Sequence, residues 1–387
     1  MENSPRAEEA GQLELRSACS ERAGLLQAVI LVGGEGTRLR PLTYGTPKPM
    51  VPLFGVPFLE RTLGRLRAAG VTEVLLASGY LPGAIRDHFG AGDGVGMRLS
   101  YFVEETPLGT AGAIRNVAAE ITGTFFVLNG DVLTSLDLRA MLAFHRARGG
   151  IGTLHAIRVD DPSAFGCIVQ DGTGRVTSFI EKPPREAAPT NEINAGTYLL
   201  EPGVLDAIPS GRAVSIERET FPGLLAHGAA LYSYVTDDYW LDVGRPAQYL
   251  QAHFDVLDGK LALDSAEGGV AERGTFVLAP GHASGNVVSP SFIGSDVTID
   301  PSAIVGPYAV LGAGCSVGPQ ATIRDSVLWD RVRVDEHARI ADAILATNVH
   351  VGAYAVVEMG AVIGHDAVIA ANTVLTPGAR VTADIGA

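Results

Sequence analysis

The sequence predicts an α/β protein: a Rossmann-like domain with a mostly parallel sheet, followed by a left-handed parallel β-helix of hexapeptide repeats. Two observations support this fold class. From residue 25 to about residue 253, apolar strand-like runs alternate with helical stretches, which is typical of βαβ units. From Ile293 onward a large apolar residue recurs every six positions, and a six-residue period indicates a parallel β-helix.

The length and composition predict two folded domains. The chain has 387 residues, of which 47% are hydrophobic and 19% are charged, so a large core is expected. We expect a mobile N-terminal tail over residues 1–24, the α/β domain over 25–258, a connector over 259–290 and the β-helix over 291–387. The formal net charge of −14 argues against a nucleic-acid partner. No apolar run approaches the roughly 20 residues that span a bilayer, so no membrane partner is expected.

The cysteines and the N-terminus bear on the cellular compartment. Cys19, Cys167 and Cys315 are far apart and form no CxxC pair. This spacing argues against a disulfide framework or a zinc site and favours a reducing compartment. The N-terminal residues also lack the basic-then-apolar order of a secretion signal. We therefore expect a cytoplasmic protein.

Within the α/β domain, the apolar runs and the glycines that follow them define the elements. Strands are expected at Leu25–Ile30, Val74–Gly79, Phe125–Asp131 and Ile151–Val159. Helices are expected at Phe58–Ala69, Gly109–Ala119 and Leu138–Arg148, with Gly70 and Gly149 as stop signals. Residues Cys167–Pro183 are expected to form a hairpin around Asp171-Gly172.

The β-helix repeat can be followed almost to the end of the chain. The large positions are Ile293, Ile299, Val305, Leu311, Val317 and Ile323, and the mostly small residues four places later are Val297, Ala303, Ala309, Cys315, Ala321 and Val327. The frame slips near Trp329 and continues weakly through Val334 and Ile340. It restarts at Val351 and continues through Val357, Ile363, Ile369, Leu375 and Val381.

The segment Leu31–Met50, LVGGEGTRLRPLTYGTPKPM, here called the signature segment, carries the clearest chemical pattern. Three glycines (Gly33, Gly34 and Gly36) follow the first expected strand, and glycine lets the backbone approach a ligand closely. Arg38 and Lys48 then add cations, which together with a glycine turn after a strand indicate phosphate binding. The segment is neither a Walker A loop nor a GxGxxG dinucleotide fingerprint.

These residues resemble the signature of the sugar-1-phosphate nucleotidylyltransferases. The resemblance covers nearly the whole chain from Leu26, with further matching motifs in the family's order: Val103–Ile114, Leu128–Asp131, Phe165–Asp171, Phe179–Pro183, Ile193–Leu200, Val214–Pro222 and Tyr239–Gly244. EETPLGTAG, SIERETFP and YWLDVG look most like mannose-1-phosphate guanylyltransferases. The resemblance implies a nucleotidyltransferase domain with a hexapeptide β-helix behind it.

The resemblance also implies roles for individual residues. Arg38 and Lys48 would bind the triphosphate, and Asp131 and Asp242 would hold Mg²⁺, so these four residues are the expected catalytic group. The nucleotide would contact Leu31, Gly33, Gly34, Gly36, Thr37, Arg38, Gly109 and Thr110, with Glu104 or Glu105, the latter preferred, reading the base. The sugar phosphate would contact Gly166, Glu181, Lys182, Asn194 and Thr197. A carboxylate that accepts from two donors weakly favours guanine.

The implied reaction is transfer of a nucleotidyl group from a nucleoside triphosphate, GTP by preference, to a sugar 1-phosphate, mannose 1-phosphate by preference. Glucose-1-phosphate thymidylyl or uridylyl transfer is the nearest alternative. A non-catalytic regulatory subunit is another, although such chains typically lose one of the charged residues that are all present here. An acyltransferase role for the β-helix is disfavoured, because the helix is short and lacks an insertion loop. A homo-oligomer assembled through the β-helix is expected.

Overall fold

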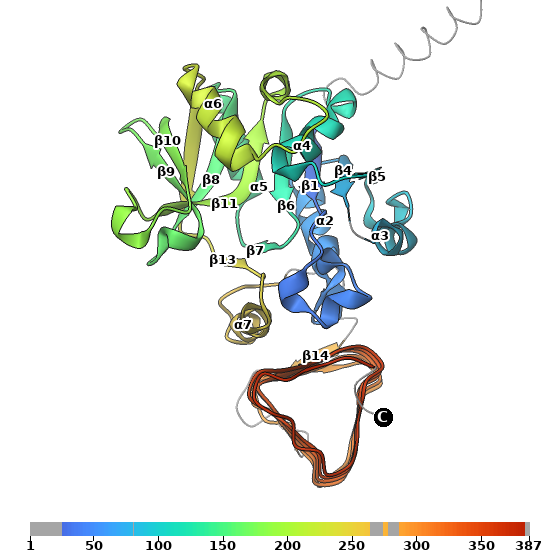
Figure 1. Cartoon of the computed structure of the whole chain (residues 1–387). Coiled ribbons are helices and arrows are strands. Elements are labelled where there is room, and N and C mark those ends of the chain that lie inside the picture. Colours follow the sequence, from blue (N-terminus) through green and yellow to red (C-terminus); the bar gives the residue numbers. More distant parts are fainter. Residues whose placement is uncertain (1–24, 80, 264–273, 278–285, 384–387) are drawn as a thin grey trace, which may run out of the picture.

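The computed structural model describes residues 25–79, 81–263, 274–277 and 286–383. The N-terminal tail expected over residues 1–24 lies outside the described residues. The two expected domains are both present, and the α/β domain sits on one side of a β-helix with a triangular cross-section (Figure 1).

The central sheet is parallel around its first strand and antiparallel at β11. β1 (Gln27–Leu31) lies between β4 (Glu73–Ser78) and β6 (Phe125–Asn129), parallel to both, and β5 (Arg98–Val103) extends the sheet beyond β4. On the other side, β11 (Glu192–Leu200) runs antiparallel to β6 and to β8 (Gly152–Arg158), and β12 (Leu231–Thr236) is parallel to β8. The strands predicted from apolar runs are therefore confirmed, with ends that differ by up to two residues.

Helices cover both faces of this sheet, which explains why its parallel strands are apolar throughout. Ala28 and Ile30 of β1 face a core with α2 (Phe58–Ala68), α3 (Pro82–Phe89) and α5 (Leu138–Arg148). Val29 faces the opposite core, which contains α4 (Gly109–Asn116) and α6 (Phe221–Ala226). The three predicted helices are present. Asp137 caps α5 by accepting from the backbone N–H groups of Arg139 and Ala140, and Gly149 ends it at φ 65°.

Two small strand pairs position residues of interest. The predicted hairpin is formed by β9 (Gly166–Gln170) and β10 (Val176–Glu181), and the Asp171 carboxylate accepts from the Thr173 backbone N–H at 2.8 Å inside its turn. β7 (Val132–Thr134) pairs antiparallel with β13 (Trp240–Asp242). This second pair places Asp242 opposite Val132, directly after Asp131, although the two aspartates are 111 positions apart in the sequence.

The β-helix consists of three parallel sheets. One contains β15 (Ser291–Gly294), β18 (Ala309–Leu311), β21 (Ser326–Leu328), β24 (Ala343–Leu345), β27 (Ala361–Ile363) and β29 (Arg380–Val381). The second contains β16 (Thr298–Ile299), β19 (Ser316–Val317), β22 (Arg333–Val334), β25 (His350–Val351) and β28 (Val368–Ile369), and the third contains β17 (Ile304–Val305), β20 (Thr322–Arg324), β23 (Arg339–Ala341) and β26 (Val356–Val357). Within the expected connector, β14 (Gly274–Val277) pairs antiparallel with β15 and extends the first sheet.

The slip in the repeat near Trp329 has a simple geometric cause. Leu311 is in register with Leu328, and Val327 is in register with Ile344, so each of these coils advances by 17 residues instead of 18. Leu328 and Leu345 therefore take the large inward positions. Val327, which the six-residue count places last in the series of mostly small residues, packs on the outward side. Ser326 is in register with inward-facing Ala309 and takes that place in the coil. The Ser326 hydroxyl donates to the Arg324 carbonyl at 2.6 Å, so its burial leaves no unpaired donor.

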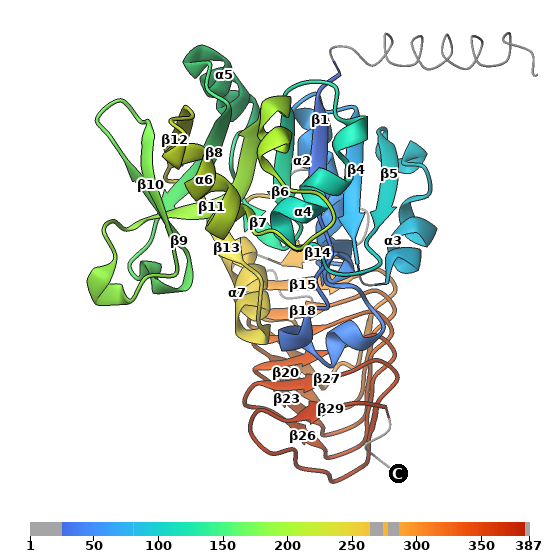
Figure 2. The same cartoon turned by 45° about the horizontal axis from the view of Figure 1, so that its top comes forward.

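The outward face of the first β-helix sheet is apolar because the α/β domain covers it. A continuous set of buried side chains, here called the interdomain cluster, joins the two domains. It contains Leu39, Leu42, Val51, Leu53, Phe54, Val56, Phe58, Leu133, Val243, Tyr249, Leu250, Ala252, Val256, Leu257 and Leu261 from the α/β domain, and Phe292, Val310, Val327, Trp329, Ile344, Ala346 and Val362 from the β-helix. α7 (Pro246–Leu257) lies between the sheet and the β-helix (Figures 1 and 2).

Substituting Val362 with alanine tests how strongly the interdomain cluster stabilises the protein. Val362 is 1% exposed in the cluster, whereas Val368 occupies the equivalent outward position on an uncovered sheet and is 52% exposed. We expect Val362→Ala to lower the free energy of unfolding by about 1–3 kcal/mol, because it leaves a cavity. Val368→Ala is the matched control and should change it by less than about 0.5 kcal/mol. Equal Tm values for the two variants would contradict a packed interface.

Candidate active site

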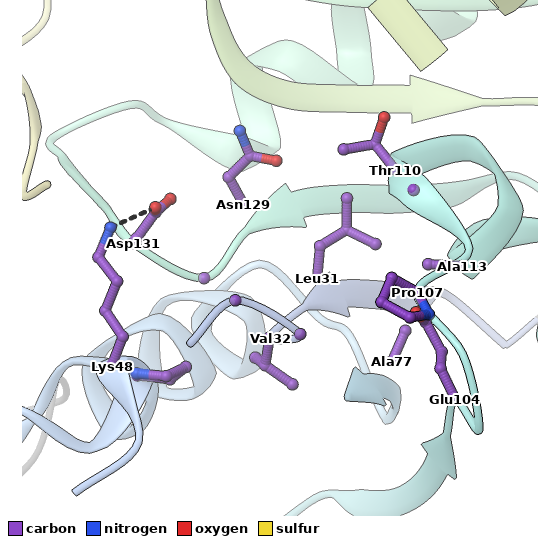
Figure 3. A pocket seen from close by; sticks show the side chains of 15 residues that line it. Leu31, Val32, Lys48, Ala77, Glu104, Pro107, Thr110, Ala113, Asn129 and Asp131 are labelled. Atoms are coloured by element: carbon purple, nitrogen blue, oxygen red, sulfur yellow. Dashed lines mark hydrogen bonds and ion pairs between the residues drawn. The ribbon is translucent and has the colours of Figure 1, made fainter. Parts of the chain in front are cut away.

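A cavity of about 360 Å³ opens at the carboxyl ends of β1 and β6. The chain leaves β1 toward β4 and β5 on one side and returns to β6 on the other. This is the switch point at which open α/β sheets bind ligands. The cavity is lined by Leu31, Val32, Gly33, Gly34, Lys48, Pro49, Ala77, Glu104, Pro107, Gly109, Thr110, Ala113, Asn129, Gly130 and Asp131 (Figure 3).

The glycines at this edge serve different purposes. A Cβ on Gly130 would lie 2.9 Å from the Leu31 carbonyl oxygen, so glycine is needed for the ends of β1 and β6 to meet. A Cβ on Gly34 would meet no atom within 4 Å, and one on Gly33 would make only an ordinary contact. Packing within the protein therefore does not demand glycine at these two positions. Open backbone beside a cavity is what close approach of a ligand requires.

The charged residues at one end of the cavity form a connected group. The Lys48 ammonium lies 2.5 Å from a carboxylate oxygen of Asp131, as the dashed line in Figure 3 shows. A Cβ on Gly244 would lie 2.9 Å from the Arg38 guanidinium, so Arg38 packs directly over the end of the YWLDVG motif. The Val243 N–H donates to the Asp131 carbonyl at 3.1 Å, which holds the chain after Asp242 against the chain before β7.

The pKa of Asp242 reflects the charges of the other residues in this group. Its pKa is raised, first because the carboxyl is partly buried and next because Asp131 is a negative neighbour. Lys48, Arg38 and Lys182 act in the opposite direction on the same carboxyl. Four residues predicted from separate motifs therefore lie within electrostatic range of Asp242. Two carboxylates and three cations in one place suit a site for bound phosphates and a cation.

The residues predicted for the sugar phosphate lie on the β9–β10 hairpin and on β11. Gly166 is paired with Glu181, and a Cβ on Gly166 would lie 2.8 Å from the Glu181 carboxylate. Lys182 follows at φ 50° and its ammonium lies 3.6 Å from the Glu181 carboxylate. A left-handed backbone at a residue other than glycine is strained, and such strain is common at binding sites.

Asn194 and Thr197 lie in or beside a bulge of β11. The register of β11 against β8 shifts between Asn194 and Tyr198. The Asn194 amide donates to the Tyr198 hydroxyl at 2.7 Å, and its carbonyl oxygen accepts from the Gly196 N–H at 3.0 Å. Thr197 is only 2% exposed and is paired with Leu128. The Asn194 side chain thus shapes the bulge, whereas Thr197 is held within the sheet.

The opposite end of the cavity is formed by α4 and the loop before it. Gly109 adopts φ 70°, and a Cβ there would lie 2.7 Å from the Val214 carbonyl oxygen, so this turn packs closely against the start of the Val214–Pro222 motif. The Thr110 hydroxyl donates to Glu217 at 2.8 Å and accepts from the Ile216 N–H at 2.8 Å. Glu217 therefore orients Thr110 rather than entering the cavity itself.

Of the two adjacent carboxylates considered for the base, Glu104 lines the cavity and Glu105 is exposed and does not. Glu104 is held by the Leu108 N–H, which donates to one of its oxygens at 3.0 Å. Figure 3 places Glu104 beside Pro107 and Ala77, away from Lys48 and Asp131. The preference for Glu105 does not agree with this geometry. A loop position two residues before a proline gives no periodic signal for which side chain turns inward.

Sequence reasoning missed several residues of the site. Asn129 and Gly130 line the cavity within the LNGD motif, Pro107 and Ala113 form its wall near Glu104, and Gly244 accommodates Arg38. Of the residues predicted to contact the nucleotide, Gly36, Thr37 and Arg38 do not line the cavity. Gly36 instead adopts φ 62° at the start of the single turn Thr37–Leu39 and packs against Lys48 and Thr43. Asn129 and Gly244 both lie within motifs that resemble the family (Leu128–Asp131 and Tyr239–Gly244), but the sequence did not show what they contact.

The carboxylates fit a divalent cation that phosphate oxygens would also bind. Within the described residues, no group of three His, Cys, Asp or Glu side chains could hold a metal ion by itself. Asp131 and Asp242 supply two carboxylates that repel each other, as the raised pKa of Asp242 indicates. A cation bound between a few carboxylates and substrate phosphates would relieve this repulsion.

Comparison with known proteins agrees with this geometry. The family model described as nucleotidyl transferase matches residues 27–259, and the one described as the GMPPB C-terminal domain matches residues 287–383. The chain therefore belongs to the nucleotidyl transferase family, whose members generally use a divalent metal.

Within this family, the chain is similar to several mannose-1-phosphate guanylyltransferases. The chain is 41% identical to a mannose-1-phosphate guanylyltransferase of Mycobacterium tuberculosis, over 80% of this chain and 81% of that protein. It is 36% identical to mannose-1-phosphate guanylyltransferase 1 of Arabidopsis thaliana, over 88% and 91%. Among solved structures it is similar to HddC from Yersinia pseudotuberculosis complexed with GMP-PN, with 31% identity and a TM-score of 0.52, over 60% of this chain and all of that one.

Replacing Asp242 with asparagine should separate stability from activity. Because the pKa of Asp242 is raised in the folded protein, the folded state binds its proton more tightly than the unfolded state. Stability therefore falls as pH rises through the interval between the unfolded and folded pKa values, and the ionised form is unfavourable above it. We expect Asp242→Asn to raise the Tm of the ligand-free protein at pH 7 and to lower turnover by about 100-fold or more.

The gain in Tm should shrink as the pH is lowered below the folded pKa, because wild-type Asp242 is then protonated too. Asp87→Asn, at an exposed position on α3, is the control and should leave both Tm and turnover unchanged. A lower Tm for Asp242→Asn at neutral pH would contradict the electrostatic interpretation.

Proposed function

We propose that this chain transfers a guanylyl group from GTP to mannose 1-phosphate and releases GDP-mannose and pyrophosphate. The observation that carries this proposal is that Lys48 and Asp131 meet in the cavity at the switch point of the sheet, while Arg38, Lys48, Asp131 and Lys182 all act electrostatically on Asp242. An oxygen of the sugar phosphate attacks the α-phosphorus of GTP. The bond from that phosphorus to the bridging oxygen breaks, and pyrophosphate leaves with the electron pair.

The cations supply positioning and charge neutralisation for two anionic substrates. Arg38 is always charged and fork-shaped, which suits the triphosphate and the departing pyrophosphate. Lys48 suits the α-phosphate, because it lies at the carboxyl ends of β1 and β6 next to Asp131. Lys182, which directly follows β10 and lies beside Glu181, binds the phosphate of the sugar phosphate. Asp131 and Asp242 would hold Mg²⁺, which neutralises charge that develops on the leaving group.

We assign the base to the end of the cavity opposite Lys48 and Asp131. Leu31, Gly33 and Gly34 form one wall with open backbone, and Gly109 and Thr110 form the other. Glu104 then lies at the end of the cavity, where its second oxygen can accept from the N1–H and N2–H₂ groups of guanine. Uracil and thymine offer one such donor. The guanylyl names of the relatives support this assignment.

The sugar lies over the hairpin and the bulge of β11. Glu181 accepts from vicinal hydroxyl groups, and glycine at position 166 leaves room for the Glu181 carboxylate, which would lie 2.8 Å from a Cβ there. An amide nitrogen carries two hydrogens, so Asn194 can donate to a hydroxyl while it holds Tyr198. Thr197 supports this floor from within the sheet.

We also propose a cytoplasmic location and a homo-oligomer formed through the β-helix. Cys167 and Cys315 are free thiols, in keeping with a reducing compartment. No helix in the described part of the chain is long and apolar enough to cross a membrane. The uncovered β-helix faces expose apolar Ile304, Val368 and Val374, which suit contact with a second copy.

Pyrophosphate release from a panel of substrates tests the reaction. We expect the highest kcat/KM with GTP and mannose 1-phosphate among pairs drawn from GTP, UTP and dTTP with mannose 1-phosphate and glucose 1-phosphate. Strong turnover only with dTTP or UTP and glucose 1-phosphate would favour thymidylyl or uridylyl transfer. No turnover with any pair would favour a regulatory subunit.

Lys182→Met tests the assignment of the second anion. We expect the KM for the sugar phosphate to rise about tenfold or more, the scale of losing a hydrogen bond to a charged group, while the KM for the nucleotide changes little. Lys260→Met is the matched control, because Lys260 pairs with Asp255 at 2.7 Å, away from the cavity. A larger effect on the KM for the nucleotide would contradict the assignment of Lys182 to the sugar phosphate.

A further inference from the structure

A histidine of the β-helix, His365, forms hydrogen bonds with the signature segment outside the active-site cavity. His365 Nε2 lies 3.2 Å from the Leu42 carbonyl oxygen and 3.1 Å from the Thr46 hydroxyl. A carbonyl oxygen can only accept, so Nε2 carries the hydrogen. Leu42 and Thr46 lie between Arg38 and Lys48 in the sequence. One imidazole of the C-terminal domain therefore holds the loop that joins two residues of the active site.

The same imidazole belongs to a chain of contacts that reaches the other side of Lys48. The His365 ring packs edge-on against Trp329, with ring centroids 5.3 Å apart. The Trp329 N–H donates to the Tyr249 hydroxyl at 2.9 Å, and that hydroxyl donates to the Pro52 carbonyl at 2.5 Å. Lys48 is thus bracketed by Thr46 and Pro52, and both are anchored to this chain.

Contacts inside the signature segment connect the residues that His365 contacts to the turn that carries Arg38. The Thr43 hydroxyl donates to the Gly36 carbonyl at 2.9 Å. A Cβ on Gly36 would lie 3.1 Å from the Cβ of Lys48, so Gly36 also packs on that side chain. The turn that carries Arg38 begins directly after Gly36. Leu39 and Leu42 are 1% and 0% exposed within the interdomain cluster, which leaves the loop little freedom to move alone.

We propose that His365 is a positioning residue for nucleotidyl transfer, through which the β-helix sets the placement of Arg38 and Lys48. The inference rests on the proposed function. A displacement of about 1 Å at groups that bind a reacting phosphate can cost about 100-fold in rate, so a hydrogen bond outside the cavity can matter for turnover. Burial lowers the pKa of His365, and the neutral ring still donates through Nε2.

Kinetics of His365→Phe and His365→Gln test this role. Phenylalanine keeps a ring against Trp329 but cannot donate, whereas the glutamine amide can replace the Nε2–H donor. We expect His365→Phe to lower kcat with GTP and mannose 1-phosphate by about threefold to tenfold, the scale of a hydrogen bond. His365→Gln should restore kcat to within about twofold of wild type. Thr46→Val removes one contact from the loop side and should shift kcat in the same direction.

Tyr308→Phe is the matched control for general weakening of the domain contact. The Tyr308 hydroxyl donates to Asp258 at 2.8 Å, which is another hydrogen bond between the domains but one that does not touch the signature segment. We expect wild-type kcat for this variant. Equal losses in Tyr308→Phe and His365→Phe, or wild-type kcat in both His365→Phe and Thr46→Val, would overturn the proposal.

Hydrogen exchange provides a readout that does not depend on activity. Amides of residues 41–50 should exchange faster in His365→Phe than in wild type or Tyr308→Phe. Unchanged exchange in that range would overturn the positioning role. If wild type shows no turnover with any substrate pair, the proposed function fails, whereas the exchange experiment still decides whether His365 holds the loop.

Discussion

The burial of one apolar β-helix face beneath the α/β domain is the interaction on which the active site depends. The charged residues of the site are followed closely in sequence by residues packed in the interdomain cluster. Arg38 precedes Leu39, Asp242 precedes Val243, and Asp131 lies two residues before Leu133. In each of these segments, a charged residue of the proposed site is thus followed within two positions by a side chain buried in the interdomain cluster. The geometry of the cations is set by packing that lies behind them.

This arrangement also explains how a chain with a net charge of −14 can bind two anions. Lys48 contacts Asp131 directly, and Arg38, Lys48 and Lys182 all influence Asp242. The local group of cations outweighs the distant negative surface, because solvent and salt screen charges that lie far from the site. The carboxylates keep the cations in place before substrate binds. A divalent cation bound by Asp131 and Asp242 would then offset their negative charge, so that the site could accept further negative charge.

Much of the fold could be predicted because its signals are local. The strands β1, β4, β6 and β8 and the helices α2, α4 and α5 follow from apolar runs and glycine stops, and the hexapeptide period identified the β-helix. Local patterns failed where a coil changed length: the six-residue count from Ile293 slips near Trp329, because two coils advance by 17 residues instead of 18. A one-residue slip exchanges the two faces of a strand, so the period alone could not show which residue lies inside.

The amino-acid sequence by itself determined the class of elements, the two domains and the set of charged residues, because periodicity and motif order are properties of neighbouring residues. Only the tertiary structure decided which of those residues meet. The pairing of β7 with β13 brings Asp242 to Asp131, the loop before α4 turns Glu104 and not Glu105 into the cavity, and the β-helix places His365 behind Leu42 and Thr46. These contacts join residues 4 to 323 positions apart, and they depend on register, turn direction and the packing of one domain on the other.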